Sequence, residues 1–179
     1  CDRIIKYWDD LPEGNNKDSY GNKMNTSVDI TNDGGNYRKC DIKWVDQQYN
    51  PKFNWVFERI MTHIELINDE YFKYDLHIPT IIGNIQYTVY KPGNFYLPHL
   101  DWAGGTKLDV RKLSFSINLS SESSYEGGGL SIYGSKINNV WKERGTITVF
   151  PSFIRHEAIE VTEGLRFVLV GWAIGPTFI

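Results

Sequence analysis

The sequence has no apolar run that approaches the ~20 residues of a membrane span, and its start, Cys1-Asp2-Arg3, lacks the apolar core of a signal peptide. It also has no basic excess, since the formal net charge is −3. A nucleic acid or a membrane surface is therefore not the expected partner. We predict a soluble, cytoplasmic protein, although a chain that starts without Met leaves an upstream segment and secretion open. The oligomeric state is not indicated.

Cysteine is scarce and no phosphate-binding loop is present. Cys1 and Cys40 have no metal-type spacing, so we expect both to be structural or incidental, and their pairing stays open. The glycine run Glu126-Gly127-Gly128-Gly129-Leu130 lacks the Lys-Ser/Thr pair and the following helix that such a loop requires. It predicts a tight connection into a strand.

The chain is long enough for one domain with its own core. It has 179 residues, of which 41% are hydrophobic and 15% aromatic. We predict a single domain over 1–179, with a loop-rich N-terminal part over 1–80 and a core over 81–179. Residues 9–36 are rich in Asp, Asn, Gly and Ser and predict a loop-rich lead-in, in which Asn32-Asp33-Gly34-Gly35 could close a hairpin.

One helix is expected, over about 51–71. Its apolar residues recur at helical spacing, at Val56, Ile60, Ile64 and Ile67. This stripe would pack against a sheet. His63 lies at its edge and is expected to flank the helix rather than bind a ligand, and His77, just before Ile78-Pro79, is expected in a loop.

Short runs of β-branched and aromatic residues, separated by Gly, Pro and Asn, predict strands. They cover 40–45, 81–82, 85–90, 112–120, 130–133, 146–150 and 165–172. No helical pattern separates the runs after Pro79, so the sheet should be antiparallel. We predict a mainly β fold with an N-terminal helix and a jelly-roll core, also called a double-stranded β-helix.

The residues with the clearest chemistry are His99 and Asp101, two positions apart after a β-rich run. In a strand, residues two apart point to the same face and could reach one metal ion. A lone His-x-Asp pair is common by chance, but His156 follows downstream. Two histidines and one carboxylate with open coordination positions form the facial triad of non-heme Fe(II) oxygenases. We predict His99, Asp101 and His156 as metal ligands.

Arg166 begins a strand that is apolar on both faces and should therefore be buried. Its own face continues with Val168, Val170 and Trp172. A buried guanidinium costs several kcal/mol unless an anion pairs with it. That anion is either a structural partner, Glu157, Glu160 or Glu163, or the carboxylate of a ligand beside the metal.

Residues 113–120 alternate strictly between large apolar and small polar side chains. The polar face carries Ser114, Ser116, Asn118 and Ser120. A face without charges indicates either the wall of an enclosed polar cavity or an exposed Ser-rich strand, and the strand alone does not choose between them.

Together these segments resemble the Fe(II)- and 2-oxoglutarate-dependent oxygenases, specifically the prolyl 4-hydroxylase-like branch. The resemblance covers roughly Tyr37 to Pro176. The matching segments are Tyr37-Arg38-Lys39-Cys40-Asp41-Ile42-Lys43-Trp44, Tyr90 with Gly93 and Tyr96, His99-Leu100-Asp101, Arg111 to Ser120, Glu126-Gly127-Gly128-Gly129-Leu130, Phe150-Pro151-Ser152 before His156, and Arg166 with Trp172.

The resemblance implies roles for individual residues. It implies that His99, Asp101 and His156 bind catalytic iron and that Arg166 pairs with the distal carboxylate of 2-oxoglutarate. Tyr90 matches a family tyrosine that contacts this co-substrate.

Three further matches are less direct. Asn118 stands where relatives often have a Tyr beside the distal carboxylate, and Arg111 and Trp172 match positions near a peptide substrate. Gly129 replaces the acidic residue usual after the paired glycines, a departure expected to be structural.

The implied reaction is the hydroxylation of a prolyl residue in a peptide or protein. It consumes 2-oxoglutarate and O₂, releases succinate and CO₂, and is expected to be supported by ascorbate. The carboxylate of Asp101 favours hydroxylation, because related halogenases lack it.

Two other interpretations stay open: a hydroxylase of a free amino acid or other small molecule, and a non-catalytic jelly-roll binding module. A nucleic-acid demethylase is less favoured, since no basic stripe with interleaved aromatics is present. The loops at 46–50 and 103–109 would cover the substrate.

Overall fold

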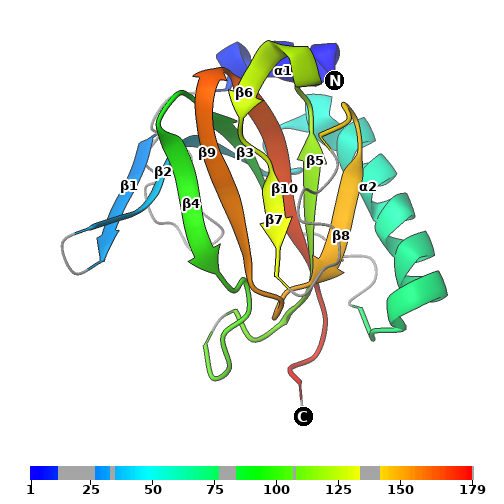
Figure 1. The fold of residues 1–179 in the computed structure, drawn as a ribbon. Helices are drawn as coiled ribbons and strands as arrows, with labels where there is room; N and C mark the ends of the chain where they lie inside the picture. The colour runs from blue at the N-terminus through cyan, green and yellow to red at the C-terminus, as the bar shows by residue number, and fades with distance from the viewer. Residues whose placement is uncertain (12–26, 33–34, 77–83, 107, 134–141, 179) are drawn as a thin grey trace.

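The computed structural model describes residues 1–11, 27–32, 35–76, 84–106, 108–133 and 142–178 (Figure 1). In chain order the elements are α1 (Asp2–Asp10), β1 (Ser27–Asn32), β2 (Gly35–Val45), η1 (Pro51–Phe53), α2 (Asn54–Ile67), η2 (Asn68–Phe72), β3 (Ile85–Tyr90), β4 (Asn94–His99), β5 (Arg111–Asn118), η3 (Glu122–Ser124), β6 (Tyr125–Gly127), β7 (Leu130–Ile132), β8 (Ile147–Pro151), β9 (His156–Gly164) and β10 (Arg166–Ile174). None of these helices is long and apolar enough to cross a membrane.

The strands form one curled, antiparallel sheet. Its main path runs β6, β9, β4, β2, β3, β10, β5, β8, while β1 pairs with β2 and β7 pairs with β9. The sheet curls so that β4 and β9 lie across from β10 and β5, which gives the strands an inner and an outer face (Figure 1). The predicted jelly-roll core is confirmed.

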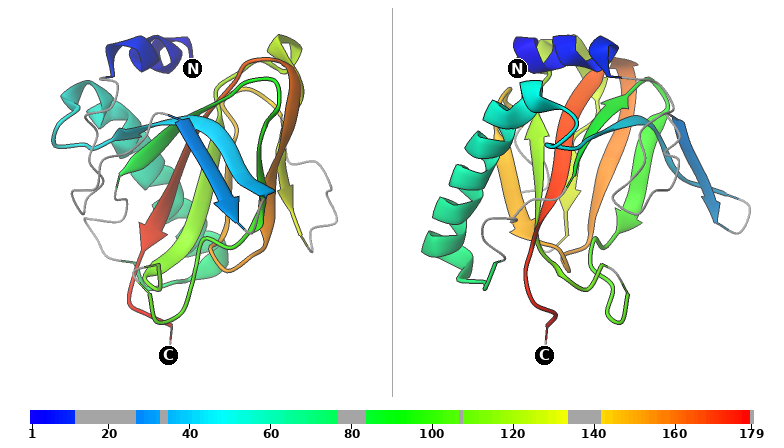
Figure 2. Two further views of the ribbon diagram at one scale, coloured as in Figure 1. Left: turned by 90° about the vertical axis from the view of Figure 1, so that its left-hand side faces the viewer. Right: turned by 180° about the vertical axis from the view of Figure 1, so that it is seen from behind.

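Helix α2 covers the outer face of β5 and β10 (Figure 2). Strand alternation directs large apolar residues to this face, because successive side chains point to opposite sides. The buried cluster between helix and sheet includes Val56, Phe57, Ile60, Ile64, Ile85, Tyr87, Leu113, Phe115, Leu119, Leu169 and Ala173. The positions between these on β3, β5 and β10 therefore face into the roll.

The predicted helix over about 51–71 is present but is not uniform. The turn η1 begins at Pro51, α2 follows, and the π-helical turn η2 ends at Phe72 before Lys73, whose φ is +59°. The buried side chain of Asn68 stabilises this end, because it bonds both the backbone N–H and the carbonyl of Tyr74 (Asn68 Oδ1 and Nδ2, both 2.9 Å).

The N-terminal part is more ordered than the sequence indicates. Strand β1 and the first residues of β2 fall within 9–36, which was predicted to be loop-rich, and Asn32 pairs with Gly35 as expected for a hairpin. Helix α1 and strands β4, β6 and β9 were not predicted. His77 and the predicted strand at 81–82 lie outside the described residues.

The glycine run connects β6 to β7 as predicted. Gly127 and Gly128 have φ of +65° and +59°. A Cβ at Gly127 would lie 2.5 Å from the carbonyl oxygen of Glu160 on β9. Only glycine allows this close approach of the two strands.

Candidate metal centre and adjoining cavity

The predicted metal ligands come together at one end of two neighbouring strands. His99 is the last residue of β4 and His156 is the first of β9, and the two residues pair across the sheet. Asp101 lies just beyond β4 rather than within it, so its position does not follow from strand alternation as the sequence argument assumed. Its backbone N–H donates to the carbonyl of Ser152 (3.0 Å). One ligand atom from each of the three residues lies within 4.8 Å of the other two.

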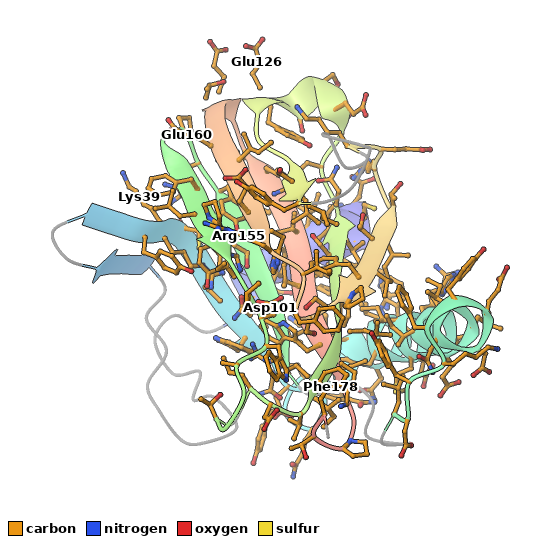
Figure 3. The ribbon with its side chains drawn as sticks, turned by 60° about the horizontal axis from the view of Figure 1, so that its bottom comes forward. Lys39, Asp101, Glu126, Arg155, Glu160 and Phe178 are labelled. Atoms are coloured by element: carbon orange, nitrogen blue, oxygen red, sulfur yellow. The ribbon has the colours of Figure 1, made fainter. Side chains whose placement is uncertain are left out.

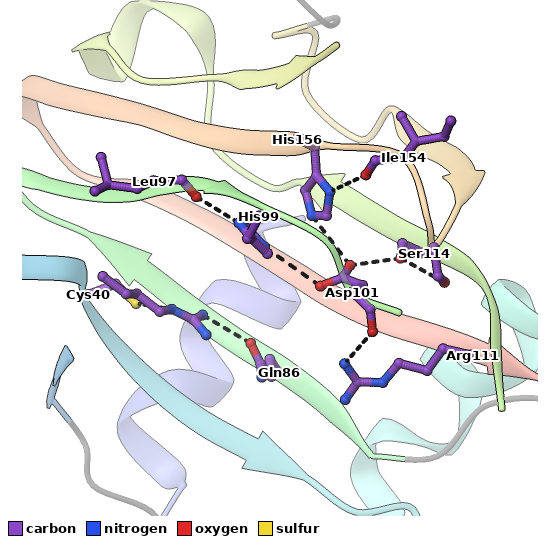
Figure 4. A network of polar contacts seen from close by, with 11 residues as sticks. Cys40, Gln86, Leu97, His99, Asp101, Arg111, Ser114, Ile154 and His156 are labelled. Carbon is purple, nitrogen blue, oxygen red and sulfur yellow. Dashed lines mark hydrogen bonds and ion pairs between the residues drawn. The ribbon is translucent and has the colours of Figure 1, made fainter. Parts of the chain in front are cut away.

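Both histidines present the same ring nitrogen to the centre. His99 Nδ1 lies 2.8 Å from the carbonyl oxygen of Leu97, and His156 Nδ1 lies 2.9 Å from that of Ile154 (Figure 4). A carbonyl can only accept, so each Nδ1 carries a proton. Each Nε2 thereby faces the carboxylate of Asp101: a proton on Nε2 is donated to that carboxylate, and its loss leaves a lone pair for a metal.

Asp101 is the negative centre of the site. Its Oδ1 is 3.6 Å from His99 Nε2, and its Oδ2 is 3.3 Å from His156 Nε2. Burial by itself would raise the pKa of Asp101, but the hydrogen bonds from His156 and His99 outweigh it and hold this pKa well below its usual value. The carboxylate is therefore ionised, as a metal ligand must be.

The hydroxyl of Ser114 on β5 fixes this carboxylate from the opposite wall. It lies 2.7 Å from Asp101 Oδ2, to which it donates, and 3.0 Å from the Ser152 hydroxyl (Figure 4). Figure 3 shows Asp101 within the roll, whereas Glu126 and Glu160 point outward at the other end.

The triad opens into a cavity of about 390 Å³ inside the curl of the sheet. Ser114 and Ser116 line it, so the small polar face of β5 forms a cavity wall rather than an exposed surface. The face of β10 that was expected to be buried lines it too, with Arg166, Val168, Val170 and Trp172.

Arg166 is a buried cation that none of the described carboxylates pairs with. It is 5% exposed, it makes no ion pair within the described residues, and its Nε has no hydrogen-bond partner there. The alternative of a structural salt bridge to Glu157, Glu160 or Glu163 is therefore not seen. Arg166 pairs across the sheet with Tyr90, above whose ring its guanidinium lies at 5.6 Å. Burial raises the pKa of Tyr90, so its hydroxyl keeps its proton.

The other predicted residues divide into two groups. Arg111 and Trp172 both line the cavity, with the Arg111 guanidinium 3.6 Å above the Trp172 ring, and Arg111 also donates to the backbone carbonyl of Asp101 (3.3 Å). Asn118 is buried but does not line the cavity. Its Nδ2 donates to the carbonyls of Ser120 (3.0 Å) and Lys142 (2.6 Å), so its expected contact with a co-substrate stays a prediction.

Several cavity residues were not assigned a role from the sequence. Tyr96 stacks on the ring of His99 with centroids 3.5 Å apart, and the guanidinium of Arg38 lies 4.4 Å above Tyr96. Both fall within segments that carry the family resemblance, which was the only available signal. His63 is exposed on α2, as expected, and bonds the carbonyl of Arg59.

Cys1 and Cys40 are both free thiols. Cys1 is exposed and Cys40 is buried, so the question of their pairing is answered.

Comparison with known sequences identifies relatives of this chain. A family model described as the 2OG-Fe(II) oxygenase superfamily matches residues 85–174. A PKHD-type hydroxylase of Rippkaea orientalis is 35% identical over 98 residues, which cover 53% of this chain and 44% of that protein. A PKHD-type hydroxylase of Crocosphaera subtropica is 36% identical over 104 residues, covering 56% and 46%. The chain thus spans less than half the length of these relatives.

Solved structures share the fold. A Pseudomonas putida prolyl-4-hydroxylase superposes with a TM-score of 0.57 at 22% identity, covering 78% of this chain and 74% of that one. A prolyl hydroxylase from Trichoplax adhaerens, in complex with a hypoxia inducible factor peptide fragment, superposes with a TM-score of 0.65 at 15% identity, covering 97% and 75%. The sequence match from β3 to the end of β10 includes all three triad residues and Arg166, and the chain belongs to the 2OG-Fe(II) oxygenase superfamily.

Proposed function

We propose that the protein is a 2-oxoglutarate-dependent prolyl 4-hydroxylase that acts on a peptide or protein. The observation that carries this proposal is the shared cavity. A two-histidine, one-carboxylate cluster opens into the same space as a buried arginine that has no anionic partner in the described part of the chain. A metal and an acidic co-substrate would satisfy both features together.

His99, Asp101 and His156 would hold Fe(II). The Nε2 atoms of His99 and His156 lie 3.6 and 3.3 Å from the nearer oxygen of Asp101, and one ligand atom of each residue lies within 4.8 Å of the others, so a single ion could reach all three. The orientation of both rings and the ionised Asp101 suit the ion, which would replace the protons on Nε2. When bound with 2-oxoglutarate and O₂, the iron supplies the oxidation by which this family hydroxylates substrates, with succinate and CO₂ as co-products.

Arg166 would bind the distal carboxylate of 2-oxoglutarate. Its guanidinium can grip a carboxylate through two parallel hydrogen bonds, and its burial makes such a pair stronger than it would be in water. The protonated Tyr90 hydroxyl on the neighbouring strand can donate to the same co-substrate.

Arg111 and Trp172 would position the substrate. The indole offers a flat apolar surface to a prolyl ring, and the guanidinium stacked on it can donate to a peptide carbonyl. The PKHD-type and prolyl hydroxylase relatives support a prolyl substrate, and ascorbate is proposed to sustain turnover as a reductant. Hydroxylation of a free amino acid is the alternative that the same cavity allows.

The test is succinate formation by the purified protein with Fe(II), 2-oxoglutarate and ascorbate, with and without proline-containing peptides. We expect peptide-stimulated turnover and a mass gain of one oxygen atom on proline, both lost in His99→Ala. Turnover with free amino acids alone would replace the prolyl assignment. No turnover despite bound iron would favour a binding module.

A further inference from the structure

Arg38 is a second buried cation in the same cavity. It lies on β2, is 7% exposed, and lines the cavity together with the metal cluster and Arg166. Its Nε donates to the Cys40 thiol (3.1 Å), and one of its terminal nitrogens donates to Gln86 Oε1 (3.0 Å; Figure 4). Its guanidinium also lies 4.4 Å above the ring of Tyr96. Within the described part of the chain no carboxylate forms an ion pair with Arg38.

The charges around the cavity do not balance. Two buried guanidinium groups line it, from Arg38 and Arg166, and Asp101 is the only carboxylate among the described residues that do so. Bound Fe(II) and the 2-oxoglutarate dianion would cancel each other and leave this surplus unchanged. Once its keto-acid end is on the metal, 2-oxoglutarate has one carboxylate left, which can pair with only one of the two buried arginines. A further anion is therefore missing from the site.

The missing anion would lie on the substrate side of the metal. Arg38 stacks on Tyr96, which stacks on the metal ligand His99. Arg38 also donates to Gln86, which pairs across the sheet with Val170, two residues before Trp172. Arg166 pairs instead with Tyr90, four residues along β3 from Gln86. A group bound to Arg38 would thus lie near the metal without competing for Arg166.

Gln86 adds a neutral donor beside Arg38. Gln86 Oε1 accepts from Arg38, so the Nε2 of the same amide takes no part in this hydrogen bond and can donate to another group. Gln86 lines the cavity, and its Nε2 has no hydrogen-bond partner among the described residues. A guanidinium and an amide N–H₂ side by side match the two oxygens of a carboxylate.

We propose that Arg38 and Gln86 form a carboxylate-binding subsite, so that the preferred substrate carries a carboxylate close to the carbon that is hydroxylated. This inference rests on the proposed hydroxylase function and narrows its substrate class. The carboxylate could be a main-chain terminus, as in a C-terminal proline or a free amino acid, or the side chain of an acidic residue next to proline. Both sources share the chemistry that the subsite recognises.

The experiment measures binding by titration calorimetry to the protein loaded with Mn(II) and 2-oxoglutarate. Two matched probe pairs separate the sources: N-acetylproline against N-acetylprolinamide, and a blocked peptide with Glu-Pro against the same peptide with Gln-Pro. We expect the acid of at least one pair to bind at least about tenfold more tightly than its amide, the size of a charge-assisted hydrogen bond. The pair that shows the difference identifies the source.

Arg38→Gln should reduce that ratio to about one and leave the dissociation constant of 2-oxoglutarate unchanged. Arg59→Gln, which removes an exposed arginine of α2, is the matched control and should keep the ratio. Gln86→Leu should lower the ratio by a smaller factor. If Arg38→Gln does not fold, the comparison of acid and amide binding to the wild-type protein still shows whether a carboxylate-binding subsite exists.

Equal binding of acid and amide in both pairs, or no binding of either acid, would overturn the subsite. An acid preference that Arg38→Gln retains would overturn the assignment to Arg38. Hydroxylation of the amide-bearing proline peptides is scored separately by mass. A protein that hydroxylates them without an acid preference keeps the proposed function and loses this inference.

Discussion

At the scale of single residues, the proposed metal centre depends on a few hydrogen bonds that orient its ligands. The Leu97 and Ile154 carbonyls each orient one histidine ring through its Nδ1, and Ser114 holds one oxygen of Asp101. Partners of this kind typically contribute a factor of about 10 to 100 in metal affinity, because they keep the ligands in one orientation.

We therefore predict that Ser114→Ala weakens Mn(II) binding about tenfold. The substitution removes the 2.7 Å hydrogen bond to Asp101 Oδ2 and leaves the three ligands in place. Ser116→Ala is the control, because Ser116 lines the same wall two residues along β5 without contacting the triad. Calorimetric titration of both variants checks the prediction, and equal affinities would show that Ser114 does not orient Asp101.

The residues that could be predicted from the sequence are those whose chemistry leaves few choices. A buried strand with one arginine requires an anion, and two histidines with one carboxylate suggest a metal, so Arg166 and the triad could be selected as candidates without knowing the fold. Asn118 and Arg38 could not be placed in this way. The direction of the Asn118 amide depends on the carbonyls of Ser120 and Lys142. Whether Arg38 has an anionic partner depends on which side chain lies beside it, and that side chain is the thiol of Cys40 rather than a carboxylate.

At the scale of elements, strands with a clear alternation were predictable and strands at the metal end were not. Strand β5 separates Leu and Phe from Ser, and this pattern identifies both of its faces. Strand β4 contains Pro98, which a strand accepts only where no ladder hydrogen bond is needed, and β9 carries three glutamates. Their places in the sheet come from pairing with each other and with β2, β6 and β7, which the sequence of neither strand encodes.

The corner between β9 and β10 requires glycine for two separate reasons. Gly164 has a φ of +73°, and a Cβ there would lie 2.2 Å from the carbonyl oxygen of Ser124. Gly105 has a similar φ of +70° but nothing within 4 Å of its hypothetical Cβ. A substitution at Gly105 therefore introduces backbone strain alone, whereas one at Gly164 introduces backbone strain and steric overlap.

We predict that Gly105→Ala lowers the free energy of unfolding by about 1–2 kcal/mol, from the left-handed conformation alone. Gly164→Ala should cost a further ~1–3 kcal/mol, because Ser124 must move and the β6–β9 pairing is disturbed. Urea denaturation of the two variants measures the difference. Equal losses would mean that the backbone at Gly164 relaxes without cost.

At the scale of the whole molecule, the proposed site joins the two walls of the roll. The triad histidines lie on β4 and β9, while Tyr90 and Arg166 lie on β3 and β10. Strand β2, from the N-terminal part that the sequence presents as loop-rich, lies between β4 and β3 and connects these walls. Its central place depends on long-range pairing, so it could not be foreseen from local patterns. Ligands that bridge the walls should stabilise the entire fold.

We predict that Mn(II) and 2-oxoglutarate together raise the melting temperature more than Mn(II) alone, because the co-substrate would bind both the metal and Arg166. A ligand at a hundred times its dissociation constant stabilises the native state by about 2.7 kcal/mol, or about 5–11 °C for a chain of this size. EDTA should abolish both increments. Differential scanning fluorimetry measures them.

Two variants assign the increments to residues. His99→Ala should lose both, since 2-oxoglutarate depends on the metal for one end of its binding. Arg166→Gln should keep the increment from Mn(II) and lose the one from 2-oxoglutarate, because the triad does not contact Arg166. Retention of the full 2-oxoglutarate increment in Arg166→Gln would place the distal carboxylate elsewhere, and Arg38 is the other buried arginine that lines the described cavity. The subsite proposed for the substrate would then belong to the co-substrate instead.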